Sequence, residues 1–356
     1  MNTSDKEMLK YFSEFYKSVG GNFEQNGENI DSKHKILLKK SLDKINEGGQ
    51  FFIENFRNSE IQDDLGCPPQ ISRKHFKKIG YFKTIKNFIL KLYSGLYEQN
   101  YRRSFFDDIS VLEEIGASEL MKKNPVHMTP GCTDFYYYKN TTLNLRWIRY
   151  LYFSQRIINN NLLKKNNTWV DIGSYYGGLQ SIICKNNPNI KFILVDFSSQ
   201  LCKSYMFLKK QYPNIKHILP DKVLNKNSYT DLNNFFAYLP VEKFKDFDFK
   251  KIDLLTNFFS FGEMKRDTFS SYYTNSFLKK VSNIYMANRF VSSPYFEKTY
   301  DTDINILDYQ SVNHKIKYLD ILPIHFYSIT KRKINGINAF RPLSSPYFEI
   351  IYKNES

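Results

Sequence analysis

The sequence contains few cysteines, and none of them is arranged as in a disulfide-stabilised or zinc-binding protein. Among 356 residues there are four, and all are isolated: Cys67, Cys132, Cys184 and Cys202. No Cys-x-x-Cys pair occurs, and no group of histidines supplies the remaining ligands of a zinc site. We therefore expect reduced thiols and no structural metal.

Long apolar runs are also absent. No stretch reaches the roughly 18 apolar residues that a membrane-spanning helix needs. The first residues, MNTSDKEMLKYF, lack the charged-then-apolar layout of a signal peptide. The expected location is the cytoplasm, with peripheral attachment to the inner face of the membrane left open. Hydrophobic residues still form 42% of the chain, which is enough for a large packed core.

Acidic residues are too few to balance the basic ones. There are 36 Asp and Glu residues against 51 Lys and Arg, so the formal net charge is +15. A charge of this size attracts anionic partners over about one Debye length. Nucleic acid, phospholipid, a nucleotide-activated sugar and an acidic polysaccharide all fit, and a plain solvated basic surface fits equally well.

The amino-terminal part has a helical pattern. Phe82, Ile85, Ile89, Leu92 and Leu96 recur at spacings of three and four, which places one apolar stripe along a helix. Such a stripe can rest on an anionic membrane, but we favour packing within a helical bundle.

Beyond residue 165, short apolar runs alternate with helical stretches, which is typical of a parallel sheet with crossover helices. We predict an α/β protein with a mainly helical region at 1–125, linking helices and a substrate-side segment at 126–165, and a Rossmann-like domain at 166–356. A closing hairpin is expected to turn near Asn335 and Gly336. The predicted strands are Thr168–Ile172, Lys191–Val195, Ile215–Leu219, Ile252–Phe258 and Asn283–Ala287, with further runs near His325–Ile329 and Tyr347–Tyr352.

A glycine-rich turn follows the first of these strands, within the stretch TWVDIGSYYGG. Such a turn lets the backbone approach a ligand at the carboxyl ends of parallel strands. Asp196 lies 19 residues after Gly177, close to the roughly 20-residue interval at which a carboxylate accepts hydrogen bonds from ribose hydroxyls. The pattern lacks the second glycine of GxGxxG. Asp171, directed into the mouth, would repel a pyrophosphate and would suit an ammonium or sulfonium group.

These residues resemble a known family. Asp171-x-Gly173-x-x-x-Gly177 with a distant acid is similar to motif I of the class I S-adenosylmethionine-dependent methyltransferases. The segment NFFSFGEM from Asn257, together with Asn288 and an upstream Leu-Arg pair at residues 145–146, resembles the sugar O-methyltransferases of bacterial polysaccharide clusters. The resemblance covers about residues 125 to 356. It departs from the family at residues 174 and 175, where two glycines would be expected.

The resemblance implies a Rossmann-like sheet, S-adenosylmethionine as cofactor, and methyl transfer to a sugar hydroxyl of a capsule or lipopolysaccharide precursor. The acceptor would be a sugar or a nucleotide- or lipid-linked sugar, expected to be anionic, and a homo-oligomer is left open. By this resemblance the cofactor would contact Asp171, Gly173, Ser174, Tyr176, Gly177, Asp196, Phe197, Asp221 and Asn257. Acceptor contacts would come from Arg146, Tyr137, Tyr272 and Asn288.

Two side chains are candidates for the base that activates the hydroxyl. Glu263 follows the strand that ends at Phe258, although a capping or ion-paired glutamate explains it equally well. His127 titrates near neutral pH, although a loop histidine is usually just exposed. For Arg146 and the aromatic residues near Tyr137, the alternatives are surface and packing roles.

Three other functions remain open on the sequence. The positive charge favours an RNA methyltransferase, but the Asn-Pro-Pro-Tyr type of tetrapeptide is missing and nucleic acid is not the preferred partner. Asp301 and Asp303 resemble the D-x-D metal site of glycosyltransferases. The altered glycine turn would suit a scaffold that has lost its activity. Cofactor affinity separates the last alternative from the rest.

Overall fold

The computed structural model describes residues 3–21, 23, 105–130, 132, 135–225, 229, 231–264, 266–290, 304–324, 327–334, 337–344 and 347–354. The chain divides into two compact units. One contains residues 1–53, 157–322 and 346–356, and the other contains residues 54–156 and 323–345. The predicted helical stripe at 82–96 lies outside the described residues, as do Asp301 and Asp303. The three-part division of the sequence stays a prediction.

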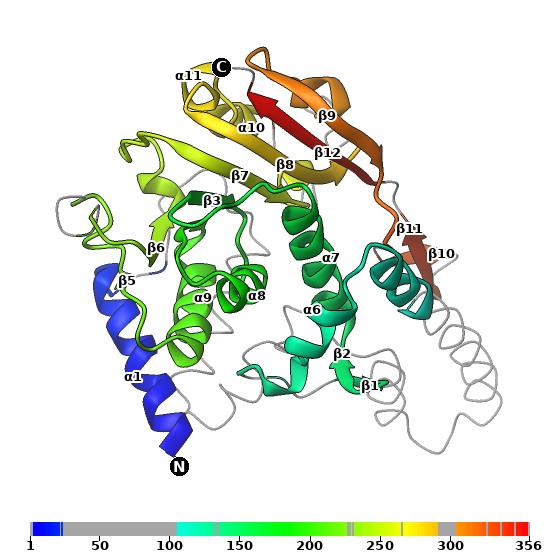
Figure 1. The fold of residues 1–356 in the computed structure, drawn as a ribbon, viewed down its shortest axis with the longest axis horizontal. Helices are drawn as coiled ribbons and strands as arrows, with labels where there is room; N and C mark the ends of the chain where they lie inside the picture. Colours follow the sequence, from blue (N-terminus) through cyan, green and yellow to red (C-terminus); the bar gives the residue numbers. More distant parts are fainter. Residues whose placement is uncertain are drawn as a thin grey trace. The chain divides into compact units, whose positions relative to one another are not determined.

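The first unit is built on an eight-stranded sheet (Figure 1). Its strands are β3 (Thr168–Ile172), β4 (Lys191–Asp196), β5 (His217–Ile218), β6 (Phe235–Pro240), β7 (Ile252–Phe258), β8 (Val281–Arg289), β9 (His314–Ile321) and β12 (Tyr347–Asn354). Its helices are α1 (Thr3–Ser18), α8 (Gly178–Asn186), α9 (Ser198–Gln211), α10 (Arg266–Tyr272) and α11 (Asn275–Leu278), with short 3-10 turns η4 (Val241–Lys243), η5 (Phe261–Glu263) and η7 (Ile306–Tyr309).

The strand order is β5-β6-β4-β3-β7-β8-β12-β9. All neighbours up to β8 are parallel, and β12 runs antiparallel to both β8 and β9. From β3 the chain builds outward through β4 and β6, then returns to the other side of β3 with β7. This reversal between β3 and β7 is the switch point of a doubly wound sheet, outside which ligands bind. The predicted Rossmann-like α/β fold is confirmed.

Most predicted strands are present, and two observed ones were not predicted. β3 and β7 have the predicted bounds, whereas β6 and β9 were missed. Every residue of β6, FFAYLP, is buried. A strand buried on both faces lacks the alternation that identifies a half-exposed strand, so its apolar run was not recognised. The predicted strand at residues 215–219 is only the two-residue edge strand β5.

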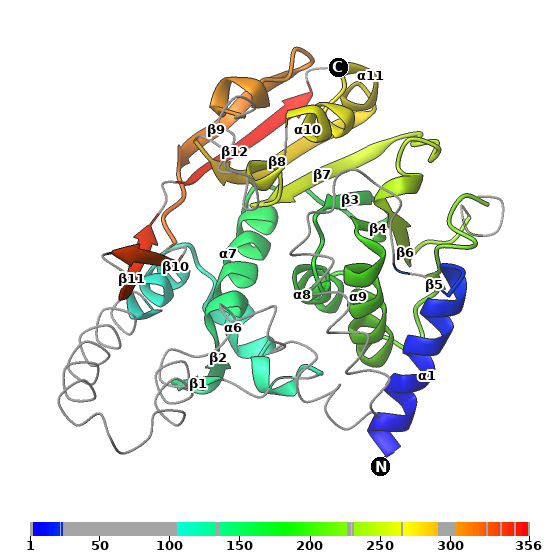
Figure 2. The same ribbon diagram turned by 180° about the vertical axis from the view of Figure 1, so that it is seen from behind.

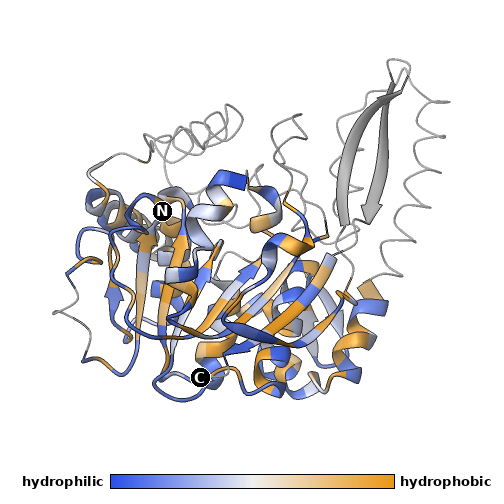
Figure 3. Cartoon of the chain, turned by 90° about the horizontal axis from the view of Figure 1, so that it is seen from above, coloured by the Kyte–Doolittle hydropathy of each residue, from blue (hydrophilic) through white to orange (hydrophobic). Residues whose placement is uncertain are grey.

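Helices cover both faces of the sheet. One face carries a continuous apolar core that includes Val170, Ile193 and Leu255 and is closed by Phe269 of α10 and Phe277 of α11. α8 and α9 cover the other face, and α1 lies against the outside of α9 in both views (Figures 1 and 2). Apolar colouring accordingly concentrates in the strands (Figure 3).

α1 is anchored to α9 by aromatic and polar contacts. Phe15 is fully buried and packs near the rings of Tyr205 and Tyr238. The hydroxyl of Tyr205 donates a 2.6 Å hydrogen bond to Glu14, and Lys210 pairs with Glu7. The first helix therefore belongs to the unit that contains the sheet.

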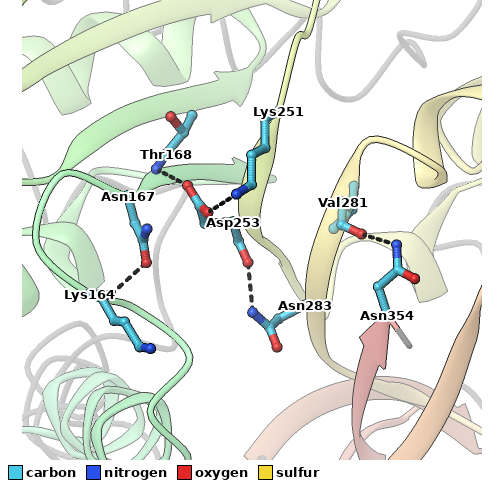
Figure 4. A network of polar contacts seen from close by, with 8 residues as sticks. All are labelled: Lys164, Asn167, Thr168, Lys251, Asp253, Val281, Asn283 and Asn354. Carbon is cyan, nitrogen blue, oxygen red and sulfur yellow. Dashed lines mark hydrogen bonds and ion pairs between the residues drawn. The ribbon is translucent and has the colours of Figure 1, made fainter. Parts of the chain in front are cut away.

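Polar contacts join the amino ends of the central strands (Figure 4). The carboxylate of Asp253 accepts a 2.8 Å hydrogen bond from the backbone N–H of Thr168, and its other oxygen lies 3.6 Å from the Lys251 ammonium. Asn283 donates to the Asp253 carbonyl at 2.9 Å. These contacts hold β3, β7 and β8 in register at the edge opposite the glycine turn.

The second unit contains helical residues 105–114 and two antiparallel strand pairs. Its elements are α6 (Ser118–Lys123), η2 (Val126–Met128), β1 (Tyr136–Tyr138), β2 (Thr141–Leu143), β10 (Tyr327–Ile334) and β11 (Ile337–Ser344), while α7 (Leu145–Asn159) crosses the unit boundary. β10 and β11 form the hairpin expected around residues 335 and 336. In the part of the chain that is described, no helix is both long and apolar enough to cross a membrane.

Candidate functional site

The glycine turn joins β3 to α8 and packs against the loop after β7. Gly173 has a φ of +80°, and a Cβ atom added there would lie 2.3 Å from the Ser260 Oγ. Gly177 has a φ of +82°, and its Cβ would lie 2.8 Å from a methyl carbon of Leu208. Only glycine combines a left-handed backbone with such close contact. The turn is therefore held tightly between the β7 loop and α9.

Tyr175 occupies the position at which another glycine would be expected. Its φ of +55° lies in the left-handed region that glycine adopts at no steric cost. A residue with a side chain there carries roughly 1 to 3 kcal/mol of strain, which persists only when the surroundings enforce it. Here the Tyr175 N–H donates to Asp196 at 2.8 Å and its carbonyl accepts from the Ser204 hydroxyl. The turn keeps a glycine-like path without the glycine.

Asp196 ends β4, directly beside the turn. Its two carboxylate oxygens accept 2.8 Å hydrogen bonds from the backbone N–H groups of Tyr175 and Phe197. Burial raises its pKa to about 6, although these bonds and the charge of Lys203 oppose the shift. Burial in turn lowers the Lys203 pKa to about 8. Since a carboxylate offers about four acceptor positions, Asp196 keeps capacity for two more donors.

Asp171 lies on β3, the neighbouring strand, and is 4% exposed. We expected its carboxylate to face the mouth, whereas it points toward α8 beneath the turn. Thr256 donates to one oxygen and Gln180 to the other, both at 2.5 Å. Burial raises its pKa to about 7 despite these bonds, and the negative charge of Asp196 adds to the shift. The two acids therefore lie close enough to sense one another's charge.

Two asparagines connect the carboxyl ends of β3, β7 and β8. The Asn257 amide donates to the Ile172 carbonyl at 2.8 Å and to Ser260 Oγ at 2.5 Å. Asn288 donates to the Asn257 side-chain oxygen at 3.0 Å and accepts from the Gly262 N–H at 3.1 Å. Both are fully buried. In the structure they brace the loop against the turn, and their predicted ligand contacts stay predictions.

Glu263 is placed by this braced loop. It ends η5, is partly buried, and its N–H donates to the Ser260 carbonyl at 3.1 Å. Because Ser260 contacts the glycine turn, Glu263 belongs to the same edge of the sheet as Asp171 and Asp196. Its predicted role as a base is untested by these contacts.

Some buried side-chain oxygens around the turn have no hydrogen-bond partner among the described residues. They include Ser174 Oγ within the turn, Gln180 Oε1 in the first turn of α8, and Gln200 Oε1 in the first turn of α9. Gln180 also donates to Asp171, and the Gln200 carbonyl accepts from the same Ser204 hydroxyl that bonds Tyr175. Buried oxygens without donors are costly, so this group matches a ligand rich in N–H and O–H donors.

Other predicted cofactor residues have visible packing roles or lie farther out. Tyr176 is 3% exposed and its ring packs 5.0 Å from that of Phe207. Asp221 is exposed and follows β5. β6 separates β5 from β4, so the strand end beside Asp196 is Pro240, one residue before η4. Asp221 thus lies one strand farther from Asp196 than the predicted strand order implied.

The predicted acceptor residues are dispersed. Tyr272 is 7% exposed, with its ring 4.8 Å from that of Phe244 in the apolar core. His127, Arg146 and Tyr137 belong to the second unit. His127 is exposed and bonds Thr142 through Nδ1 at 2.7 Å. Tyr137 is 79% exposed and Arg146 is partly buried on α7. These contacts bring none of the three to the glycine turn, and the roles stay predictions.

Three residues near the site were not predicted. Thr256 and Gln180 hold Asp171, and Glu242, two residues beyond β6, accepts a 3.3 Å hydrogen bond from Ser198. Thr256 directly precedes Asn257, so its position on a buried strand was a signal. Glu242 could have been found only by recognising β6. Within the described residues, no three His, Cys, Asp or Glu side chains are grouped to hold a metal ion.

Comparisons with known proteins support the fold and nothing finer. No protein-family model matches the chain, and no curated protein matches it. Among solved structures, a Thermoplasma acidophilum protein is 12% identical over 59% of this chain and 90% of its own, with a TM-score of 0.37. An S-adenosylmethionine-dependent methyltransferase from Clostridium acetobutylicum is 11% identical over 60% and 93%, with a TM-score of 0.36.

A third match is the magnesium protoporphyrin IX methyltransferase of Synechocystis with bound S-adenosylhomocysteine. It is 8% identical over 59% of this chain and 84% of its own, with a TM-score of 0.35. At such scores the strand order described above, and not the matches, carries the assignment. The chain has a mostly parallel, Rossmann-like α/β fold of the methyltransferase kind.

Proposed function

We propose that this chain is an S-adenosylmethionine-dependent methyltransferase that methylates a hydroxyl of an anionic sugar, free or nucleotide- or lipid-linked, in bacterial surface-polysaccharide synthesis. The observation that carries the proposal is the pair of acids on adjacent strands. Asp171 and Asp196 flank a strained glycine turn at the switch point, and burial raises both pKa values. Buried acids of this kind gain from a cationic, hydroxyl-bearing ligand.

The residues present fit such a cofactor. Asp196 would accept hydrogen bonds from the ribose hydroxyls, with Phe197 and Glu242 on the adenine side. Asp171 and the unpartnered Ser174 oxygen would face the ammonium end. Gly173 leaves room that a Cβ atom would fill. A dinucleotide pyrophosphate would fit less well, because it would place negative charge beside two carboxylates.

When bound, the cofactor supplies an electrophilic methyl group on sulfur. The chain supplies position, since aligning two reacting groups gives much of the rate of such a displacement. The asparagine-braced loop would hold Glu263 where it can take the proton of the acceptor hydroxyl. The sugar acceptor is supported by the sequence resemblance and the net charge of +15.

Calorimetry with S-adenosylhomocysteine tests the cofactor, and transfer of a labelled methyl group to acidic sugars and their nucleotide-linked forms tests the acceptor. We expect binding, and labelling of a sugar but not of RNA. Binding with labelling of RNA alone would replace the acceptor class. Absence of binding would leave the scaffold alternative, and manganese-dependent turnover of a nucleotide sugar would indicate the glycosyltransferase.

Cofactor affinity is expected to fall with decreasing pH. The folded-state pKa of Asp171 is about 7 and that of Asp196 about 6, both above the usual value for an aspartate, so each carboxyl is increasingly protonated as the pH falls through these values. A cationic ligand binds the charged forms, so affinity is greatest above pH 7. Between pH 7.5 and 5.5 we expect S-adenosylhomocysteine to bind about 20-fold more weakly.

Asp171→Asn supplies the control for this prediction. The variant keeps an acceptor for Thr256 and cannot ionise, so it should bind more weakly at pH 7.5 and show a much flatter pH profile. An unchanged profile in the variant would assign the titration to another group. The same sign applies to stability: raised carboxyl pKa values make both acids unfavourable to the unliganded fold as the pH rises toward 7.

A further inference from the structure

Exposed apolar side chains gather at one edge of the sheet. Ten large hydrophobic side chains are exposed among the described residues, and five of them lie between residues 307 and 321. Three belong to β9 itself: Ile316 is 54% exposed, Leu319 46% and Ile321 62%. Scattered exposed apolar residues are normal, whereas a row of them on one strand marks a contact surface.

β9 also presents an unpaired backbone edge. It is the last strand of the sheet order, paired with β12 on one side and with no other described strand on the second. Unpaired N–H and C=O groups along an edge can pair with another strand, and proteins usually blunt such edges. β9 contains no proline, and its eight residues make it a long edge.

The exposed side chains lie on one face of the sheet. Pairing with β12 places Ile316, Leu319 and Ile321 opposite Tyr352, Ile350 and Phe348, all of the apolar core. The register shifts by one residue at Lys317, which keeps Ile316 on the same face as the other two despite its even number.

The two charged residues near the strand ends lie on the opposite face. Lys315 faces Lys353 of β12, and Asp320 faces Glu349, and both side chains are exposed. The strand therefore presents an apolar row on one face and one charge of each sign on the other.

The order of these residues is self-complementary. If a second β9 runs antiparallel with Ile316 opposite Leu319 of the partner subunit, Lys315 falls opposite Asp320 of the partner subunit. Each pair then occurs twice around a two-fold axis, which is the condition for an isologous contact. Apolar and opposite-charge pairs directly across strands are stabilising, and like charges there are destabilising. Most other partners would meet the lysines of this edge without a matching acid.

We propose that β9 is a dimerisation edge, through which two copies of this chain join their sheets into one by antiparallel pairing of β9 with β9. The contact combines backbone hydrogen bonds along the edge with the Ile316–Leu319 and Lys315–Asp320 pairs. It lies at the opposite side of the sheet from β5 and does not depend on the proposed methyltransferase activity.

Charge reversal on the full chain tests this register. Lys315→Asp and Asp320→Lys should each weaken the dimer about tenfold, because each places two like-charge pairs across the contact. Combining both substitutions reverses both pairs and should restore the dimer constant to within about threefold of the unmodified chain. Sedimentation velocity over a concentration series gives the constants, and circular dichroism checks the fold.

Lys245→Asp is the matched control, because it makes the same charge change at an exposed lysine in the turn after η4 and should leave the dimer constant unchanged. A chain that sediments as a monomer throughout the micromolar range would overturn the proposal. So would a dimer that both single reversals leave intact, or one that the double reversal does not restore.

Discussion

Replacing Asp196 by alanine is expected to weaken the binding of S-adenosylhomocysteine by about 100-fold or more. The ribose would lose hydrogen bonds to a charged acceptor, each of which contributes about 1.5 to 3 kcal/mol. The same carboxylate holds the backbone N–H of Tyr175, so the strained turn would also lose its support. Calorimetric titration of both proteins at pH 7.5 measures the effect.

The appropriate control is Asp248→Ala, which removes an exposed acid whose nearest cation, Lys280, is 3.8 Å away. It should leave affinity unchanged. Urea unfolding of Asp196→Ala separates loss of binding from loss of the fold. Normal affinity in a folded Asp196→Ala protein would remove the ribose assignment and the proposed cofactor with it.

Gly173→Ala is the second change with a large expected effect. The new methyl group would require a residue with φ of +80° and would overlap Ser260 Oγ and Cβ, which lie 2.3 and 2.7 Å from its position. Strain and overlap together should lower the free energy of unfolding by about 3 kcal/mol. Because the turn is where the ligand is proposed to bind, affinity for S-adenosylhomocysteine should fall as well.

Two further variants separate the causes. Gly116→Ala has nearly the same backbone angle, φ of +83°, and open space around its Cβ, so it reports strain alone and should cost less. Ser260→Gly removes the overlapping atoms, so the double variant with Gly173→Ala should be more stable than the sum of the single effects predicts, by about 1 kcal/mol. Additive effects would show that contact with the β7 loop does not matter.

Local patterns were sufficient for the centre of the sheet. β3 and β7 have their predicted bounds because each is an apolar run ended by turn-forming residues, a pattern that the neighbours in sequence specify. β9 reads HKIKYLDI and is mostly exposed, so it lacks a buried face by which to be recognised. β12 was predicted as a closing strand, but its place between β8 and β9 depends on pairing with segments far away in the sequence.

The candidate site was predicted in part for the same reason. The spacing of Gly173, Gly177 and Asp196 indicated a ligand at the first turn, since both strand ends must meet at one edge of a parallel sheet. What holds Asp171 could not be read from spacing. Its partners, Gln180 and Thr256, come from α8 and from β7, 85 residues away.

By itself the sequence determined the class of fold, the position of the glycine turn and the two acids beside it, because strand periodicity and turn chemistry are local properties. Only the tertiary structure decided that Asn257 and Asn288 brace the β7 loop, that Tyr175 takes a left-handed conformation, and that Asp171 is buried. Each of these depends on atoms from different strands meeting in space, and no interval along the chain encodes which side chains will meet.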